Sequence, residues 1–294
     1  MKGQLAQAFA ELVKQVFCAA PHAVVSPAQL KRVVGKWAPH FSGYNQQDCQ
    51  EFMRFLLDGL GEDLNRLRIV AKPEEAAPKK EGVSPTEAEQ SDDMWQHYMK
   101  RNDSLVTEIF CGQLRSSVEC TTCGHVSLCF DPFLDISLPI PKKAEVTERS
   151  KKTGAGGVQG TGQCTLDECL QAFTAEEILD NENKYTCDRC KKRRKCVKKL
   201  TIHRWPRVLV LHVKRFQYTA VYRDKLTTSI AFPFKGLDLR DYISETRHAD
   251  ADRCAVHMCG ARVQGLREGR LIPITTKEAD HVIGFHRCTQ RLLA

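Results

Sequence analysis

Two Cys-x-x-Cys pairs constrain the fold of this chain more than any other feature. "CTTC" runs from Cys120 to Cys123, and "CDRC" runs from Cys187 to Cys190. A two-residue spacer turns the backbone back on itself, so both thiolates of a pair can reach one tetrahedral Zn²⁺ at about 2.3 Å. Gly124 follows the first pair, where a tight turn needs a residue without a Cβ. Because 63 residues separate the pairs, tertiary structure must bring them together, and we expect them at the tips of two hairpins.

Four cysteines fill the coordination shell of zinc and leave no position for water. We therefore expect one structural Zn²⁺ rather than a catalytic one, and the alternative is four unrelated buried thiols. Other cysteines lie in apolar or strand-like contexts and are interpreted as core or surface thiols rather than extra ligands. These are Cys111, Cys129, Cys164, Cys169 and Cys196. The later group of Cys254, His257 and Cys259 has poor ligand spacing and is interpreted as chance.

Composition bounds the class of protein. The chain has 294 residues, of which 42% are hydrophobic, enough for one large domain or two ordinary ones. No stretch approaches the ~20 apolar residues of a membrane span, and the start "MKGQLAQAFAELV" lacks the features of a secretory signal. In a reducing compartment, Cys-x-x-Cys pairs are typical of metal ligands. We therefore expect a cytoplasmic or nuclear protein with no membrane partner.

The positive charge of the chain is local. "RCKKRRKCVKK", residues 189–199, has eight basic residues and no acidic one, which equals the net charge of +8 of the whole chain. Such a run is typical of a solvated turn and less often docks phosphate or an acidic protein. It lacks the interleaved aromatic residues that stack on bases. A zinc-ribbon nucleic-acid-binding protein is kept as an alternative function, but nucleic acid is not the expected partner.

Helices are predicted in the first part of the chain. Residues 4–17 repeat apolar side chains on one helical face, and a second helix begins after Ser26 as its N-cap and continues to Trp37, which should face inward. A third helix is predicted to follow Asn45 as N-cap, with Asp48 reaching back to the free amides. Its inward face is predicted to contain Phe52, Phe55, Leu56, Leu60 and Leu64. Residues 1–70 should therefore form a helical part.

Strands are predicted in the second part. "QLRSSVEC" and "LCFDPFLDISLPI" alternate with period two, and residues 207–216 are apolar on both faces, as expected for a central strand. Residues 165–173 form a helix with a capping box between Thr165 and Glu168. The predicted fold class is α+β, with helices first and residues 94–245 as the second folded part, in which strands outnumber helices after residue 110.

Two polar segments interrupt these parts. Residues 71–93 have almost no large apolar side chain and a surplus of acid, and residues 141–163 are rich in Lys, Gly and Thr. Neither composition can bury much apolar surface. We expect the first to be a disordered linker and the second a disordered insertion.

Five motifs occur in the order and spacing of a known family. They are "GYNQQDCQEFMRFLLDGL", "GQLRSSVECTTCG", "FDPFLDISLPIP", "CDRCKKRRK" and "RVLVLHVKRF". From about residue 4 to residue 245 the chain resembles ubiquitin-specific proteases, the papain-like cysteine deubiquitinases, and most of all their short-finger subgroup. The resemblance implies a helical thumb, a palm sheet and zinc-ribbon fingers that hold ubiquitin. It also implies thiol-dependent hydrolysis of the bond after the terminal glycine of ubiquitin, with ubiquitin and ubiquitinated proteins as partners.

The resemblance also implies residues that contact ubiquitin. Gln47 and Asp48 match the box that contacts the ubiquitin tail in the family, and a carboxylate suits the arginines of that tail. The alternative is that Asp48 only caps its helix. Phe130 and Phe133 match a palm and finger surface that supports ubiquitin, and a plain core role is the alternative.

The chain departs from the family pattern in its catalytic boxes. The Gly-Asn-Thr-Cys box of the nucleophile would precede Met1, and the Gly-His-Tyr-like box of the general base is not found after residue 245. His281 and His286 lack the Gly-His-aromatic setting. We therefore assign no catalytic residues, interpret residues 246–294 as a tail unrelated to the family, and expect an incomplete form of the fold. Whether the chain is itself an enzyme is left open, and a catalytically dead ubiquitin-binding module is the alternative.

Cys49 is the one cysteine with a physical argument for replacing the nucleophile. It is predicted at a helix start, where the dipole lowers a thiol pKa. A nucleophile also needs a base within hydrogen-bond reach, and no histidine is near it in sequence. We interpret Cys49 as a packing residue.

Overall fold

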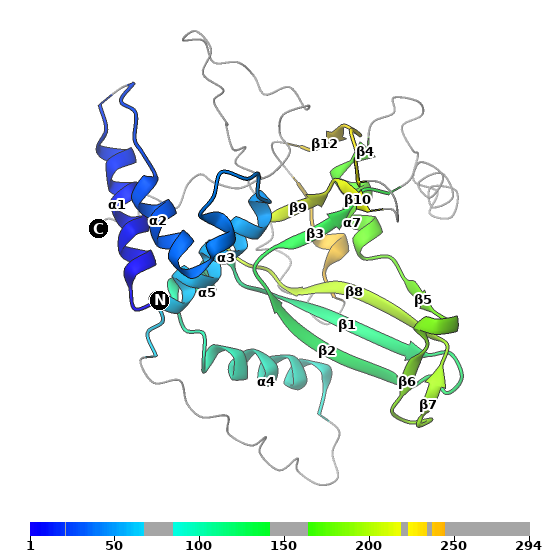
Figure 1. Ribbon diagram of the computed structural model, residues 1–294. Coiled ribbons are helices and arrows are strands. Elements are labelled where there is room, and N and C mark those ends of the chain that lie inside the picture. The colour runs from blue at the N-terminus through cyan, green and yellow to red at the C-terminus, as the bar shows by residue number, and fades with distance from the viewer. Residues whose placement is uncertain (21, 68–84, 142–163, 219–222, 234–236, 245–294) are drawn as a thin grey trace. The chain divides into compact units, whose positions relative to one another are not determined.

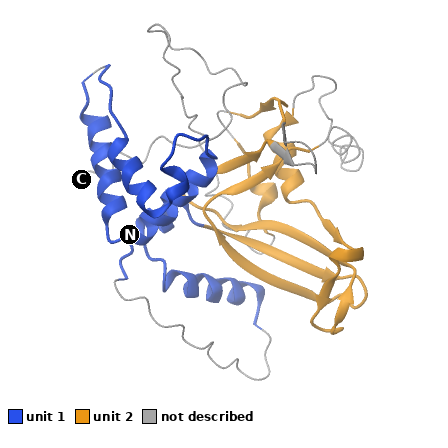
Figure 2. Cartoon of the chain, viewed as in Figure 1, with its two compact units in different colours: residues 1–111 blue, residues 112–294 orange. Residues whose placement is uncertain are grey.

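The computed structural model describes residues 1–20, 22–67, 85–141, 164–218, 223–233 and 237–244 (Figure 1). Two compact units divide the chain, residues 1–111 and residues 112–294 (Figure 2). The described helices of the first unit precede the strands, all of which lie in the second. This confirms the predicted α+β class. The described strands begin at Gly112, in agreement with the prediction that strands outnumber helices after residue 110, while residues 94–111 are mainly helical and belong to the first unit.

The first unit is built from helices. Its elements are α1 (Gln4–Cys18), α2 (Ala28–Trp37), the 3-10 helix η1 (Pro39–Phe41), α3 (Cys49–Asp63), α4 (Glu87–Met99) and α5 (Leu105–Phe110). α1 packs against α2 and α3, and α3 packs against α5. Gly59 permits the close approach of α3 to α1, since a Cβ there would lie 2.6 Å from Cδ2 of Leu5. None of the helices in the described ranges is long and apolar enough to cross a membrane.

The inward faces of these helices differ in part from the prediction. Trp37, expected to face inward, is 42% exposed. On α3, Leu57 is buried with Leu60, while Leu64 is exposed because it follows the last turn of the helix. Helical periodicity therefore located the helices, but the neighbours that each side chain meets decided its burial.

The predicted linker 71–93 extends too far at its C-terminal end. Residues 87–93 lie in α4, which begins with a capping box. The Thr86 hydroxyl accepts from the Glu89 N–H at 3.3 Å, and the Glu89 carboxylate accepts from the Thr86 N–H at 2.8 Å. These bonds satisfy N–H groups that the start of a helix leaves free. Residues 71–84 lie outside the described residues, as do 142–163 of the predicted insertion and the whole of 246–294.

A four-stranded antiparallel sheet dominates the second unit. Its order is β2-β1-β8-β5, with β1 (Gly112–Cys120), β2 (Val126–Phe133), β8 (Cys196–Arg204) and β5 (Glu177–Leu179). The hairpin of β6 (Tyr185–Cys187) and β7 (Lys192–Arg194) precedes β8. The register places Gly112 opposite Phe133 and Cys120 opposite Cys196.

Shorter strand pairs and one helix complete the second unit. β3 (Ile136–Pro139) pairs in parallel with β9 (Leu211–Lys214), and β4 (Cys164–Thr165) pairs in parallel with β12 (Ile230–Ala231). β10 (Phe216–Tyr218) and β11 (Arg223–Lys225) form a hairpin, and the 3-10 helices are η2 (Asn181–Asn183) and η3 (Arg240–Tyr242). Helix α7 (Leu166–Phe173) packs against β3 and begins with the predicted Thr165–Glu168 capping box. Its Leu166 and Leu170 enter the main core with Leu138, Ile202 and Leu239.

The prediction of one central strand over 207–216 is wrong. β9 is limited to Leu211–Lys214, and among the described residues it pairs with β3 alone. Pro206 has no N–H for a strand ladder, and the Arg215 side chain bonds the carbonyls of Leu226 and Thr228.

Candidate functional site

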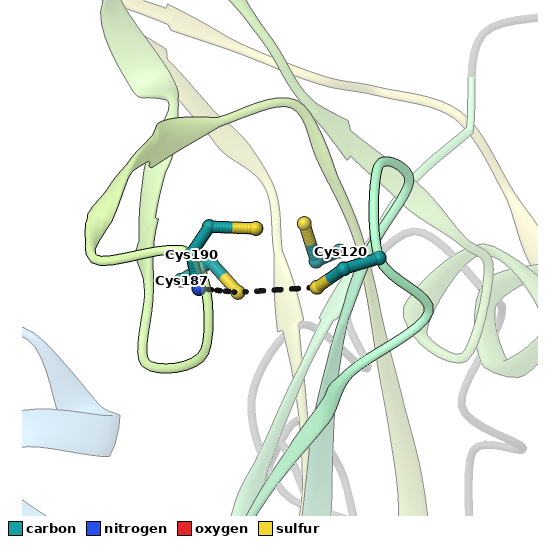
Figure 3. A group of neighbouring side chains, drawn as sticks. Cys120, Cys187 and Cys190 are labelled. Carbon is teal, nitrogen blue, oxygen red and sulfur yellow. Dashed lines mark hydrogen bonds between the residues drawn. The ribbon is translucent and has the colours of Figure 1, made fainter.

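The two Cys-x-x-Cys pairs meet at the ends of two hairpins (Figure 3). Cys120 ends β1 and Cys123 lies in the turn to β2, while Cys187 ends β6 and Cys190 lies in the turn to β7. Their four Sγ atoms lie within 4.8 Å of one another, and those of Cys123 and Cys187 are 3.7 Å apart. The predicted gathering of these four cysteines is confirmed.

The two turns share one backbone geometry. Gly124 N–H donates to the carbonyl of Cys120 at 2.9 Å, and Lys191 N–H donates to the carbonyl of Cys187 at 2.8 Å. Both residues have a positive φ, +64° for Gly124 and +53° for Lys191. Glycine adopts this conformation without cost, whereas the Cβ of a lysine crowds its own backbone there. Gly124 could be recognised from sequence, but a lysine gives no such signal.

Electrostatics of the cluster favour a bound cation. The backbone N–H of Thr122 lowers the pKa of Cys120 to about 6. The hydrogen-bonded thiol of Cys123 and burial raise the pKa of Cys190 to about 12. Four thiolates this close repel one another, and a divalent metal offsets that repulsion because its ligands bind deprotonated. Four tetrahedral thiolates are the donor set that zinc takes in structural sites, so these residues fit the expected ion.

A fifth cysteine lies beside the cluster. Cys196 is fully buried opposite Cys120, and it packs in the same small core as the four candidate ligands. Burial raises the pKa of its thiol, as does the charge of Cys120. Sequence reasoning interpreted Cys196 as a core or surface thiol, and the structure places it in the core.

The start of α3 holds the two candidate contact residues of the first unit. The predicted N-cap Asn45 is wrong: α3 begins at Cys49, and Asp48 is the N-cap. Asp48 Oδ1 accepts from the N–H groups of Gln50 at 2.7 Å and Glu51 at 3.3 Å. Gln47 Nε2 donates to the carbonyl of His40 at 2.8 Å. Both side chains are exposed, so the capping role of Asp48 is confirmed and the contact of both residues with ubiquitin stays a prediction.

The two candidate aromatic residues are buried in the second unit. Phe130 is 1% exposed, and its ring meets the His203 ring edge-on with centroids 4.8 Å apart. Phe133 is 5% exposed and covers Gly112, where an added Cβ would lie 2.5 Å from Cζ of Phe133. Their burial favours the core alternative, and a direct contact with ubiquitin stays a prediction.

Cys49 lies at the first position of α3 with its side chain exposed. Partial burial of the thiol and the negative charge of Asp48 raise its pKa. The helix dipole alone would lower it. The physical argument for Cys49 as a nucleophile is therefore weaker than the sequence suggested, while its exposed side chain does not support the interpretation as a packing residue.

Comparison with known families gives a match over most of the chain. The family model for ubiquitin carboxyl-terminal hydrolase covers residues 1–255. The chain belongs to the ubiquitin carboxyl-terminal hydrolase family. The match extends beyond residue 245, so residues 246–255 of the predicted non-family tail belong to the matched region.

Known members of the ubiquitin carboxyl-terminal hydrolase family are similar over this same region. Ubiquitin carboxyl-terminal hydrolase 2 of Gallus gallus is 43% identical over 246 residues, covering 84% of this chain and 63% of the relative. The Homo sapiens protein of that name is 43% identical, with 83% of this chain and 37% of the relative covered. Ubiquitin carboxyl-terminal hydrolase 21 of Homo sapiens is 37% identical over 253 residues, with 82% and 42% covered. The chain therefore spans less than two thirds of the length of these relatives.

A solved structure shares the fold. The SAGA DUB module of Ubp8, Sgf11, Sus1 and Sgf73 bound to monoubiquitin matches with a TM-score of 0.53 at 24% identity. The match covers 83% of this chain and 45% of that chain. The fold of the ubiquitin carboxyl-terminal hydrolase family, predicted from five motifs, is confirmed.

Proposed function

We propose that this chain is the ubiquitin-holding part of a ubiquitin-specific protease. The reaction it serves is thiol-dependent hydrolysis of the bond after the terminal glycine of ubiquitin, and its partners are ubiquitin and ubiquitinated proteins. The family match over residues 1–255 is the observation that carries this proposal. The names of the relatives, ubiquitin carboxyl-terminal hydrolases 2 and 21, support the same chemistry.

Gln47 and Asp48 are proposed to contact the ubiquitin tail. Both side chains are exposed at the start of α3, and the cap bonds of Asp48 both use Oδ1. A carboxylate can accept paired hydrogen bonds from an arginine of the tail. Phe130 and Phe133 are proposed to support ubiquitin indirectly, since their rings are buried and hold β2 in place.

The four-cysteine cluster is proposed to bind one structural Zn²⁺. Cys120, Cys123, Cys187 and Cys190 offer four sulfur ligands and thus close a tetrahedral shell. The ion would join the β1–β2 turn to the β6–β7 turn and so fix the end of the sheet. Every cysteine in the described ranges is free, which supports the proposal of a reducing, cytoplasmic or nuclear location.

Two alternative functions compete with this proposal, and experiments can distinguish them from it. The first is a catalytically dead ubiquitin-binding module, which a covalent ubiquitin vinyl probe would distinguish from an enzyme. A nucleic-acid-binding protein would use the basic run 189–199, yet part of that charge is already paired, since Lys195 lies 3.3 Å from Asp180. Binding to DNA or RNA that falls steeply with salt would identify this third function.

Asp48→Asn tests the proposed ubiquitin contact. Asparagine caps a helix as well as aspartate does, so α3 should keep its stability while the charge is lost. A charge-assisted hydrogen bond contributes about 1.5–3 kcal/mol, so we expect roughly tenfold or greater loss of affinity for ubiquitin by calorimetry, at an unchanged Tm.

The matched control is Asp58→Asn, which removes the same charge from an exposed position of the same helix. It should leave ubiquitin affinity unchanged. Equal affinity of the Asp48→Asn variant and the unmodified chain would refute the contact, and so would an equal loss in both variants.

A further inference from the structure

A pair of buried thiols lies at the start of α7, among residues of the main core. Cys164 in β4 is 6% exposed, and Cys169 in α7 is fully buried. Their Sγ atoms are 3.6 Å apart. This is thiol contact rather than a bond, because a disulfide requires about 2.05 Å. No step of the proposed function uses either residue.

The local sequence around the start of α7 places the two thiols in contact. Thr165 is the N-cap of α7, so Cys164 occupies the position before the cap and Cys169 the fourth helical position. An apolar pair commonly occupies these two positions and fixes the entry of the chain into a helix. The capping box holds the turn, with Thr165 N–H donating to Glu168 Oε2 at 2.7 Å. Cys164 N–H donates to the carbonyl of Ser229 at 2.9 Å, which anchors the other side.

The surroundings make the two sulfurs chemically unequal. The hydrogen bond from Cys164 lowers the pKa of Cys169, and the positive charge of Arg215 adds to this against the opposing effects of burial and Glu168. Arg215 is itself buried and is held by bonds to the carbonyls of Leu226 and Thr228. The same thiol contact raises the pKa of Cys164, as do burial and Glu168. Cys169 is thus the more readily deprotonated thiol of the pair.

We propose that Cys164 and Cys169 are a modification site, a dithiol that hydrogen peroxide converts into an intramolecular disulfide. The Cys169 thiolate attacks one peroxide oxygen, the O–O bond breaks, and hydroxide leaves, giving a sulfenic acid. The sulfur of Cys164 then attacks the sulfur of Cys169. The S–S bond forms, the S–O bond breaks, and the departing hydroxide takes the proton of Cys164. Two thiols and one peroxide thus give one disulfide and two waters.

The bond would join two elements that border the core. β4 pairs with β12, and α7 packs against β3. The six-residue loop from 164 to 169 would then be closed covalently, which restricts the unfolded chain at this junction. The oxidised chain should therefore unfold at a higher temperature than the reduced chain. This inference does not depend on the proposed function.

Peptide mapping of the full chain with zinc bound tests the proposal. After hydrogen peroxide treatment, the chain is denatured and its remaining free thiols are alkylated, and trypsin then releases residues 153–184, which contain these two cysteines and no other. We expect this peptide to lose two hydrogens and both alkyl labels. Further cleavage after Asp167 or Glu168 should leave the halves joined until a reductant is added.

Cys164→Val separates redox chemistry from packing. It keeps an apolar side chain before the cap but cannot form the bond, so Cys169 should stop at sulfenic or sulfinic acid and the rise in unfolding temperature should vanish. Cys111→Val, at a buried thiol of the first unit, should leave the cross-link unchanged. The proposal is wrong if both thiols stay alkylatable at a peroxide dose that oxidises the exposed Cys129, or if Cys169 gives the same product with and without Cys164.

Discussion

Single residues set the geometry of the two turns that carry the cysteines. Gly124 and Lys191 hold equivalent positions and the same positive φ, but one has no Cβ and the other has a full side chain. The left-handed conformation costs an L-residue about 1–2 kcal/mol, part of which glycine loses again through its greater freedom when unfolded. The second turn is therefore under strain that the first turn lacks.

Lys191→Gly should relieve this strain. We expect the free energy of unfolding of the zinc-bound chain to rise by up to about 1 kcal/mol, measured by denaturant unfolding. Gly124→Ala is the reverse change at the equivalent position and should destabilise the chain by about 1 kcal/mol or more. A destabilised Lys191→Gly variant would show that the lysine side chain makes stabilising interactions that outweigh the cost of its left-handed backbone conformation.

Asp63 caps a helix other than its own. It is the last residue of α3, and its fully buried carboxylate accepts from the N–H groups of Gly3 at 2.9 Å, Leu5 at 2.9 Å and Ala6 at 3.1 Å. Gly3, the N-cap of α1, has no side chain to do this. A carboxylate is unfavourable at the C-terminus of its own helix and favourable at the N-terminus of another. One residue therefore ties the start of α1 to the end of α3.

Asp63→Asn should destabilise the first unit by about 1–3 kcal/mol at pH 7, since a charged acceptor of buried N–H groups is lost. Burial raises the pKa of Asp63, but the N–H groups of Gly3 and Ala6 together with the N-terminal amine of Met1 outweigh it and lower the pKa overall. A lowered folded pKa means that the stabilisation is present above the unfolded value of about 3.9 and is lost as the pH falls through the folded value. Urea unfolding at pH 7 and at about pH 3 should show the difference between variant and unmodified chain shrinking with acid. Asp58→Asn, at an exposed position, should show no comparable effect, and a difference independent of pH would contradict this account.

At the scale of elements, local signals were recognised from sequence and non-local ones were not. The capping box of α7 involves residues three apart, and it was predicted correctly. α4 has an equivalent box at Thr86 and Glu89 but was missed, because the acidic, apolar-poor segment before it suggested a linker. The extent of β9 depends on its partner β3, far away in the chain, so an apolar run alone overestimated it. The four metal ligands were found because their spacing is local within each pair, whereas Cys196 joins them only through strand register.

The start of β1 depends on close packing at Gly112. A Cβ there would lie 2.5 Å from Cζ of Phe133 and 2.6 Å from the carbonyl oxygen of Arg204, so β1 is confined on both sides. Gly112→Ala should cost about 1–3 kcal/mol of stability through overpacking. Gly61→Ala in α3 is the matched control, since its Cβ would meet Ser104 Oγ at an ordinary 3.6 Å, and alanine should instead favour the helix. Thermal unfolding of both variants measures the difference, and equal stability of the two would refute the packing argument.

Metal binding should join the two hairpins into one element. Elemental analysis of the purified chain should find about one zinc per chain, because four thiolates at this spacing gain folding free energy from the ion. Cys187→Ser should lose the zinc and lower the unfolding temperature, and a strong chelator should do the same to the unmodified chain. Cys196→Ala removes the buried thiol beside the cluster and should keep the zinc. A folded chain without metal, or a Cys187→Ser variant that retains the zinc, would refute the assignment of these four cysteines as a zinc site.

At the scale of the whole molecule, family and fold could be predicted while activity could not. Five motifs in order were enough for the fold, because each marks a local element whose place in the fold the family fixes. Activity depends on a few atoms brought within hydrogen-bond distance, which no spacing rule supplies. The burial of Phe130 and Phe133 shows the same limit, because the sequence pattern of an aromatic strand is the same whether its rings face a binding partner or the core.

The last prediction is that this polypeptide binds ubiquitin without hydrolysing its conjugates. Cysteine-protease catalysis needs a thiolate, an imidazole that takes its proton and a group that orients the imidazole. Cys49, the one cysteine with an argument for this role, has its pKa raised by burial and by the negative charge of Asp48, both of which disfavour the thiolate. We expect no turnover of a fluorogenic ubiquitin substrate and no covalent adduct with a ubiquitin vinyl probe, beside an active ubiquitin-specific protease as positive control. The same preparation should still bind ubiquitin, and Asp48→Asn should weaken that binding. Turnover that Cys49→Ala abolishes would show instead that the start of α3 holds a nucleophile, and loss of binding with the fold intact would remove the ubiquitin-holding role.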